Sequence, residues 1–357
     1  MDRHPSISIH VFSIIIRERS QSPTNQAPNT TKRQRIVIQK MENVPVLDLS
    51  LDRATVVQTM DQALRQFGFF YVRGHGVDPA LVQGQWEAAK ALFALPLQEK
   101  ISMPFDPQLD IGYVGQGVQS LDPDGTVQHA GDTKEQFMMT NNQLMTDPTS
   151  STDPTKVFHG SHNYKPNVPG YDDAMEAYAS ALFRLDQQLN SILFEALQLD
   201  QETQTALGKE PFVVLKQMRY AGDPSDPEKG KFGAGAHCDW GAFTILWTDD
   251  TPGLEILFDG QWLPVPPKPD CFIINSGDQI AQLTNNHYKS AMHRVVTRSS
   301  KPRFSTAFFT YFGIQANVGP LAKFVSTAQK AAYPHRTTLD YFHFKLHESM
   351  GVEVRGK

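Results

Sequence analysis

Gly235-Ala236-His237-Cys238-Asp239-Trp240-Gly241 is the stretch that decides the fold and chemistry expected of this 357-residue chain. Alternate side chains of a strand point to opposite faces, so His237 and Asp239 should project together while Cys238 points away into packing. A second imidazole is available further along the chain, from His293. Two imidazoles and one carboxylate can occupy one face of an Fe(II) ion and leave its other positions open. The sequence therefore predicts a metal site formed by His237, Asp239 and His293.

A second pair with the same spacing follows the metal motif. Arg303 and Ser305 open a run of β-branched and aromatic residues that extends to Phe312, and such a run is typical of a strand. On one face of that strand, a guanidinium fork and a hydroxyl suit a carboxylate. The same Arg-x-Ser spacing occurs at Arg298, but in a turn-like segment before Pro302. Arg303 and Ser305 are therefore predicted to bind an acidic co-substrate.

The second half of the chain has the pattern of an all-β barrel. From Phe212 onward, short strands alternate with turns. Asp259-Gly260, between Leu-Glu-Ile-Leu-Phe and Gln-Trp-Leu-Pro-Val, is a typical hairpin turn. Eight or so strands with ligands on inward faces fit a double-stranded β-helix, a form of jelly roll. The expected fold class is α+β and mainly β, with an N-terminal α/β region and a long supporting helix.

The first half of the chain has helical patterns. Residues 54–67 and 79–101 are predicted to be helices, with a strand at 69–72 between them. A long helix is predicted over residues 172–199, because apolar residues recur there at helical spacing. They are Met175, Tyr178, Leu182, Leu185, Leu189, Leu193 and Leu197.

The ends of the predicted helices carry two further expectations. Asp172 or Asp173 is expected to cap the start of the long helix with its side chain. Residues 337–350 are predicted to form a C-terminal helix, which could act as a lid over the barrel mouth.

Several more motifs follow one another along the chain. They are Val44-Pro-Val-Leu-Asp-Leu49, Gly68-Phe-Phe-Tyr-Val-Arg-Gly-His-Gly-Val77, Asp132-Thr-Lys-Glu-Gln-Phe137, Thr244, Pro252-Gly-Leu-Glu-Ile256, Asn275-Ser-Gly-Asp278 and Tyr288-Lys-Ser-Ala-Met-His-Arg-Val295. With this series and the metal motif, the chain resembles the isopenicillin N synthase-like branch of the Fe(II)/2-oxoglutarate-dependent oxygenases. The resemblance extends from about Val44 to about Tyr341.

The resemblance implies a cofactor and a reaction. The family's metal ligands fall on His237, Asp239 and His293, and its co-substrate-binding residues on Arg303 and Ser305. It implies Fe(II), with 2-oxoglutarate and O2 as co-substrates and ascorbate as a possible reductant. The reaction implied is decarboxylation of 2-oxoglutarate to succinate and CO2, coupled to hydroxylation or desaturation of a small organic substrate.

One strand departs from the family pattern. Where the family usually has Arg-x-Asn-x-Tyr-Pro, this chain has Met218 in place of the asparagine and Ala221 in place of the proline. Tyr220 matches the tyrosine, so the resemblance implies that it helps to hold the co-substrate. The departure at Met218 puts in doubt how the carboxylate nearest the metal is held.

Two residues are candidates for the substrate end of the pocket. Phe309 shares the inward face of Arg303 and Ser305, although ordinary core packing explains it equally well. Lys216 lies four residues before Tyr220 and so shares its face. It could meet an anionic or phenolic substrate, although most lysines are simply solvated. Relatives act on flavonoids, hormones, alkaloids, nucleobases and peptides, so the resemblance does not select among these substrates.

Two other functions also agree with the sequence. One is an Fe(II) oxidase of the same family that does not use 2-oxoglutarate, since such relatives also keep Arg-x-Ser. Release of succinate with candidate substrates would separate it from a 2-oxoglutarate-dependent enzyme. The other is a non-catalytic binding protein that keeps the fold, against which the intact metal motif argues.

Composition agrees with a soluble enzyme. At 40% apolar residues, the chain can bury a large core. A net charge of −5 gives no reason to expect a nucleic-acid partner. Cys238 and Cys271 cannot form a disulfide framework, which favours a reducing compartment and a cytoplasmic location. No apolar run reaches the roughly 18–20 residues of a membrane span. A monomer that binds no membrane is expected.

Residues 1–40 differ from the rest of the chain. They contain seven basic residues against Asp2 and Glu18, and their polar, proline-containing part is typical of disorder. The segment is either a transit peptide for an organelle or a dispensable leader before a start at Met41. Residues 41–200 are expected to form the N-terminal region with the long helix. Residues 201–357 are expected to form the jelly-roll domain.

Three other histidines are expected to have no part in the site. His75 follows a strand in a motif that is structural in the family. His343 and His347 are one helical turn apart, but the glutamate pattern of a zinc protease is missing. They are predicted to be a surface pair.

Overall fold

The structure of the protein, a computed structural model, describes residues 44–106, 110–119, 131–141 and 166–349. The expectations for residues 1–40 lie outside these described residues. Within them, no helix is both long and apolar enough to cross a bilayer.

Eight strands of the described residues form a large sheet. In spatial order they are β1 (Val46–Asp48), β2 (Phe69–Arg73), β10 (Phe272–Ser276), β7 (Phe243–Thr248), β12 (Arg303–Gly313), β5 (Pro211–Tyr220), β4 (Lys134–Thr140) and β3 (Gly112–Val114). Only β1 and β2 pair in parallel within this described sheet. Strands from both halves of the chain share the sheet, and the division near residue 200 stays a proposal.

A smaller sheet has four described strands. Its spatial order is β6 (Ala234–His237), β11 (His293–Val295), β8 (Leu254–Phe258) and β9 (Gln261–Pro264). The described strands from β5 to β12 divide evenly, four in each sheet. The two sheets together form the predicted double-stranded β-helix, or jelly roll.

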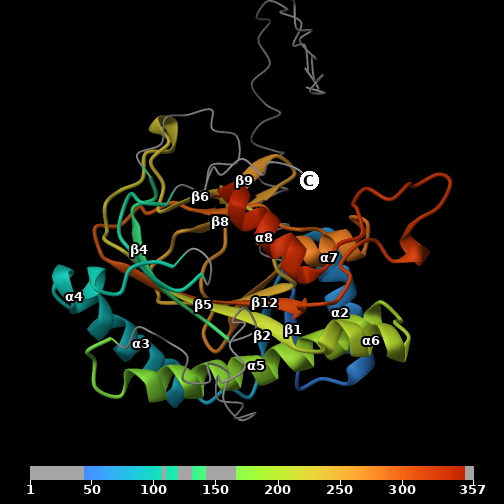
Figure 1. The fold of residues 1–357 in the computed structure, drawn as a ribbon, viewed down its shortest axis with the longest axis horizontal. Coiled ribbons are helices and arrows are strands. Elements are labelled where there is room, and N and C mark those ends of the chain that lie inside the picture. Colours follow the sequence, from blue (N-terminus) through green and yellow to red (C-terminus); the bar gives the residue numbers. More distant parts are fainter. Residues whose placement is uncertain (1–43, 107–109, 120–130, 142–165, 350–357) are drawn as a thin grey trace, which may run out of the picture. The chain divides into compact units, whose positions relative to one another are not determined.

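Helices surround the sheets (Figure 1). They are α2 (Arg53–Gln66), α3 (Pro79–Ala94), α4 (Leu97–Ile101), α5 (Tyr171–Ala196), α6 (Gln201–Gly208), α7 (Asp278–Leu283) and α8 (Thr338–Ser349), with 3-10 turns at Pro227–Lys229 and Ala322–Phe324. The long helix α5 runs along the large sheet and contacts α2, α3, β7 and β12. Its predicted apolar stripe is buried in the main core.

Residues 79–101 form two helices, not the single one predicted. α3 ends at Ala94 and α4 begins at Leu97. Between them, Leu95 has an extended ψ of 149°. The residue before a proline is forced out of the helical region, so Pro96 breaks the helix.

The prediction that Asp172 or Asp173 caps the long helix is wrong. The capping residue is Gly170, whose φ of 73° lies in the left-handed region that favours glycine. Both aspartates lie in the first turn of α5. Their negative charges are favourable there because they face the positive end of the helix dipole. The helix also ends at Ala196, before the predicted Leu199.

The predicted hairpin turn is confirmed. Asp259 and Gly260 have φ values of 49° and 77°, and a two-residue hairpin turn of this kind needs both to be positive. Phe258 and Gln261 pair directly on either side of the turn. This hairpin joins β8 to β9 in the small sheet.

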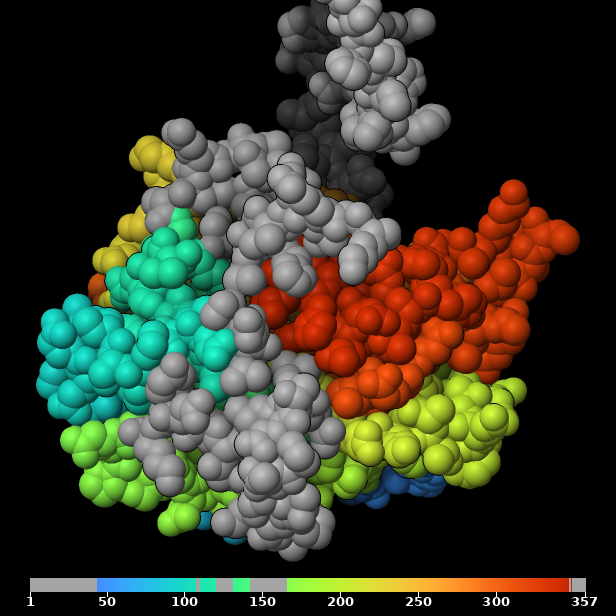
Figure 2. Space-filling model, in the orientation of Figure 1, coloured from blue at the N-terminus to red at the C-terminus, as the bar shows by residue number. Residues whose placement is uncertain are grey.

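The C-terminal helix forms as predicted and lies against the barrel. Phe342 and Leu346 of α8 pack with Phe212 and Tyr311 of the large sheet. In the space-filling view, the red surface of α8 lies above the yellow-green surface of α6 (Figure 2). His343 of α8 is exposed, as expected for a surface residue, whereas the side chain of His347 lies outside the described part.

Strand register places a row of polar side chains on the inner face of the large sheet. Lys134 of β4 pairs with Tyr220 of β5, and Tyr220 pairs with Arg303 of β12. Directly paired residues share one face of a sheet. Further along the same face lie Ser305 and Phe309, two and six residues after Arg303.

Candidate metal centre and co-substrate pocket

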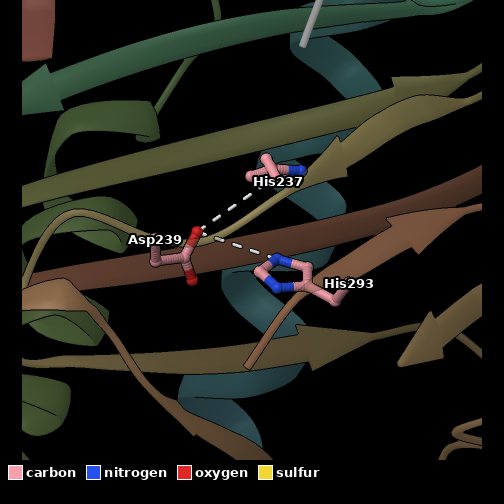
Figure 3. Close-up of side chains that lie close together, drawn as sticks. All are labelled: His237, Asp239 and His293. Atoms are coloured by element: carbon pink, nitrogen blue, oxygen red, sulfur yellow. Dashed lines mark ion pairs between the residues drawn. The ribbon is translucent and has the colours of Figure 1, made fainter. Parts of the chain in front are cut away.

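The three predicted metal ligands lie together between the two sheets. His237 ends β6 and His293 begins β11, and the two residues are direct partners in the small sheet. Asp239 lies two residues beyond the end of β6, so it is held by a loop and not by the strand that was predicted. Figure 3 shows the three side chains pointing toward one another. One ligand atom from each lies within 4.8 Å of the others, close enough to hold one ion.

Backbone carbonyls fix the direction of both imidazoles. Nδ1 of His237 lies 2.8 Å from the carbonyl oxygen of Gly235, and Nδ1 of His293 lies 3.0 Å from that of Ala291. In the neutral form, Nδ1 can donate a proton to each carbonyl, and Nε2 keeps its lone pair. Each Nε2 lies 3.7 Å from Oδ1 of Asp239 (Figure 3). The free lone pairs therefore face the carboxylate.

Two side chains hold the other oxygen of Asp239. Oδ2 accepts hydrogen bonds from Thr244 Oγ1 at 2.5 Å and from Asn275 Nδ2 at 2.6 Å. Both donors are buried, and they leave Oδ1 facing the imidazoles. Burial alone would raise the pKa of Asp239, but His293, His237 and the two hydrogen bonds lower it overall. The carboxylate is therefore ionised and oriented for a cation.

The electrostatics at His237 favour a neutral imidazole. Burial, together with the neighbouring imidazole of His293, lowers the pKa of His237. A metal ligand must be unprotonated at the coordinating nitrogen. Two neutral nitrogens and one carboxylate oxygen are a ligand set that suits Fe(II) with open positions for other ligands.

The predicted co-substrate residues also come together. Arg303 and Ser305 are each 2% exposed, and Nη1 of Arg303 lies 3.3 Å from Oγ of Ser305. The guanidinium carbon lies 4.9 Å from the ring centre of Tyr220. Nε donates to the carbonyl of Thr251 at 3.2 Å. The fork is thus held in place by Tyr220 of β5, by Ser305 of β12 and by Thr251 in the loop between β7 and β8.

No carboxylate of the described residues lies within ion-pair distance of Arg303. The nearby carboxylate of Asp249 accepts hydrogen bonds from the backbone N–H groups of Phe304 and Thr251 instead. An unpaired buried charge is costly. A guanidinium that is held rigidly and buried, with no carboxylate of the described residues within ion-pair distance, is therefore suited to an incoming anion.

One cavity joins the metal cluster to Arg303. It contains about 950 Å³ of empty space, including its opening to solvent. Its described lining residues include all eight predicted site residues: Lys216, Tyr220, His237, Asp239, His293, Arg303, Ser305 and Phe309.

The side chain of Lys216 is only partly exposed, whereas most lysine side chains are solvated. Its Nζ lies 3.5 Å from Oδ2 of Asp110 and 5.4 Å from the ring centre of Phe309. Both Asp110 and Phe309 also line the cavity. Lys216 and Phe309 therefore both line the cavity that contains the metal cluster.

The structure gives other partners to the residues that were not predicted to take part in the site. Arg298 forms an ion pair with Glu255 and its side chain is 63% exposed. His75 accepts a hydrogen bond from the N–H of Val77 and packs against Phe272. The thiol of Cys238 lies 3.9 Å from the carbonyl of Ser290, and burial raises its pKa to about 11. A neutral thiol of this kind agrees with packing, although Cys238 also borders the cavity.

Several contributors were not assigned a role from the sequence. The hydrogen bonds of Thr244 and Asn275 to Asp239 were not predicted, although both residues stand in the motifs that carried the resemblance. Trp240 and Tyr311 also line the cavity. Tyr311 could have been found from the alternation of β12, because it continues the face of Arg303, Ser305 and Phe309.

Two family models match the chain. The 2OG-Fe(II) oxygenase superfamily matches residues 211–311. The N-terminal region of non-haem dioxygenases in morphine synthesis matches residues 44–163. The first match spans the metal cluster and most of β12.

Individual proteins are similar over most of their length. The 2-oxoglutarate-Fe(II) type oxidoreductase of Aspergillus fumigatus is 30% identical over 336 residues, which cover 89% of this chain and 94% of the relative. Homoarginine-6-hydroxylase of Arabidopsis thaliana is 31% identical and covers 79% of this chain and 76% of its own. The crystal structure of JOX2 in complex with 2OG, Fe and JA has a TM-score of 0.68 at 27% identity, and covers 84% of each chain.

Proposed function

Because the chain belongs to the 2-oxoglutarate- and Fe(II)-dependent oxygenases and is thus a dioxygenase, we propose that His237, Asp239 and His293 hold its iron. The observation that carries the proposal is the orientation of the three ligand atoms. Both Nε2 atoms face Oδ1 of Asp239 at 3.7 Å. Every remaining polar atom of the three side chains has its own hydrogen-bond partner.

Fe(II) with 2-oxoglutarate and O2 supplies the oxidative decarboxylation, to succinate and CO2, that drives hydroxylation or desaturation of a small organic substrate. The chain's own part is to position these molecules and exclude water. Thr244 and Asn275 keep the carboxylate of Asp239 turned toward the metal. The backbone carbonyls of Gly235 and Ala291 keep the two imidazoles in the tautomer that a metal needs.

Arg303 and Ser305 are proposed to bind the distal carboxylate of 2-oxoglutarate. The guanidinium has no carboxylate partner among the described residues, and a dicarboxylate reaching the metal would supply one. A 2-oxo acid without that second carboxylate would leave Arg303 buried and unpaired, which selects against it. Tyr220 is proposed to support the co-substrate, since its ring holds the guanidinium from the next strand.

The substrate is proposed to bind in the same cavity beside Phe309 and Lys216, which both line it. We also propose, from composition, that the enzyme acts as a cytoplasmic monomer without membrane or nucleic-acid partners. Size-exclusion chromatography of the purified protein tests the oligomeric state, and elution as a dimer would contradict it.

Anaerobic titration with Fe(II) tests the metal assignment. The protein is expected to bind one Fe(II) per chain, and His237→Ala, Asp239→Ala and His293→Ala are each expected to lose turnover. Even residues that only orient ligands change metal affinity or activity by roughly 10–100-fold, so loss of a ligand should cost more. Unchanged iron binding and succinate production in all three variants would refute the assignment. A substrate screen that couples succinate release to mass spectrometry would then identify the product.

A further inference from the structure

The strand that carries His237 lies at the edge of its sheet. β6 pairs with β11 on one side, and no other described strand pairs with its second side. Edge strands present backbone N–H and C=O groups that need other partners. How this open edge is held therefore bears on the position of His237.

A buried carboxylate binds the open edge of β6. Oδ1 of Asp132 accepts a hydrogen bond from the backbone N–H of Gly235 at 3.0 Å. The next residue, Thr133, donates its N–H to the carbonyl of Phe232 at 3.0 Å. The segment before β4 thus forms one hydrogen bond to β6 and one to the residues just before it. It also ties the small sheet to the large one.

The charge of Asp132 is balanced inside the protein. Nζ of Lys134 donates to Oδ2 of Asp132 at 2.7 Å, and both side chains are about 95% buried. One carboxylate oxygen thus binds the backbone while the other binds an ammonium. A buried carboxylate without such a partner would be costly. Lys134 also lines the cavity.

Gly235 connects this pair to the iron site. Its N–H binds Asp132, and its carbonyl accepts from Nδ1 of His237 at 2.8 Å. We propose that Asp132 is a positioning residue for the iron site, whose carboxylate fixes Gly235 and thereby the direction of the His237 imidazole. This inference rests on the proposed function, since it takes His237 to be a metal ligand.

The same strand provides a matched control. Glu135 follows Lys134 in β4, so its side chain points to the opposite face. Its Oε2 lies 2.7 Å from Nζ of Lys100, and this pair is also buried. Neither residue is among those described as lining the cavity. The Asp132–Lys134 and Glu135–Lys100 pairs are similar in distance and burial. They differ because only the first is hydrogen-bonded to β6, the strand that carries His237.

The test compares two double variants that both remove the charge pair. Asp132→Asn with Lys134→Met keeps an oxygen that can accept from Gly235. Asp132→Leu with Lys134→Met does not. Replacing a buried ion pair by apolar residues of similar volume is often tolerated, so both variants are expected to fold. The control is Glu135→Gln with Lys100→Met. The measurements are the dissociation constant for Fe(II), by anaerobic titration, and the melting temperature of the metal-free protein.

The Leu variant is expected to bind Fe(II) about 10-fold more weakly, as residues that orient ligands do. The Asn variant should stay close to the wild type, and the control should change the melting temperature without changing the Fe(II) dissociation constant. Three results would overturn the inference. They are unchanged Fe(II) binding in the Leu variant, equally weakened Fe(II) binding in the Leu and Asn variants, or Fe(II) binding in the control that is weakened as much as in the Leu variant.

The wild type separates this inference from the proposed function. If wild-type protein binds one Fe(II) and His237→Ala does not, the metal assignment stands whatever the Asp132 variants show. If the wild type binds no Fe(II), the proposed function fails first.

Discussion

On the outer face of β4, the carboxylate of Glu135 lies among three donors, whereas on the inner face of β12 the guanidinium of Arg303 meets no carboxylate of a described residue. Glu135 accepts from Lys100 and Tyr113, both at 2.7 Å, and from Arg219 at 2.8 Å. Both groups are at least 96% buried. The two groups differ in their partners. The described residues supply hydrogen-bond donors for the carboxylate of Glu135, but they supply no carboxylate within ion-pair distance of Arg303.

This contrast separates a structural charge from a functional one. A buried charge that the chain neutralises stabilises the folded state, and removing a partner destabilises it. A buried charge without a partner destabilises the folded state, and binding of a ligand of opposite charge can offset that loss of stability. Variants on the two faces should therefore change different measured quantities.

The largest expected effect on stability is on the outer face. Glu135→Gln leaves the charges of Lys100 and Arg219 without their carboxylate, and breaking a buried pair costs about 3–5 kcal/mol. Urea unfolding should show a loss near the lower figure, since Arg219 is partly exposed. The KM for 2-oxoglutarate should not change. A raised KM for 2-oxoglutarate with an unchanged free energy of unfolding would contradict the structural role of Glu135.

Asp186 of α5 provides a second test on the helix side of the sheet. Burial raises the pKa of this carboxyl from 3.8 to about 7. The folded state therefore keeps a proton that the unfolded chain releases above about pH 4. Its contribution to stability is present at low pH and is lost as pH rises toward 7.

Asp186→Asn should remove that dependence. As pH rises from about 4 to about 7, the free energy of unfolding of the variant should increase relative to that of the wild type by on the order of 2–4 kcal/mol. Urea unfolding of both proteins at pH 5 and pH 8 measures the difference. A constant difference at the two pH values would show that Asp186 titrates normally in the folded protein.

The smallest effect concerns the orientation of Asp239. Thr244→Val removes one of the two hydrogen bonds to Oδ2, and Asn275 keeps the other. Fe(II) affinity should fall about 10-fold, or about 1.4 kcal/mol. The control is Thr248→Val in the same strand, because the hydrogen bonds of Thr248 within the described part of the chain go to the backbone carbonyls of Asp249 and Phe304. Equal affinity in both variants would leave Asn275 as the group that orients Asp239.

The parts of the site that the sequence predicted are those fixed by local geometry. Arg303, Ser305 and Phe309 follow from alternation along one strand. His237 and Asp239 were also expected from strand alternation, and they do meet, but a loop and not the strand directs Asp239. The break at Pro96 follows from a local rule as well and could have been predicted.

The remaining features depend on which strands become neighbours. Asn275 reaches Asp239 only because β10 lies beside β7, and Asp132 reaches Gly235 across 103 residues of chain. The partial burial of Lys216 depends on Asp110, which the sequence separates from it by more than 100 residues. Alternation within one strand contains no information on such pairings.

Binding of 2-oxoglutarate tests the open charge of Arg303 most directly. With Fe(II) present, Arg303→Ala should raise the KM for 2-oxoglutarate by about 30-fold to several-thousand-fold, the equivalent of about 2–5 kcal/mol for one lost partner of a buried charge pair. Ser305→Ala should cost about 0.5–2 kcal/mol, and Arg298→Ala, whose exposed side chain pairs with Glu255, should have no effect. All three variants should still bind Fe(II). An unchanged KM in Arg303→Ala, or a raised KM in Arg298→Ala, would contradict the account.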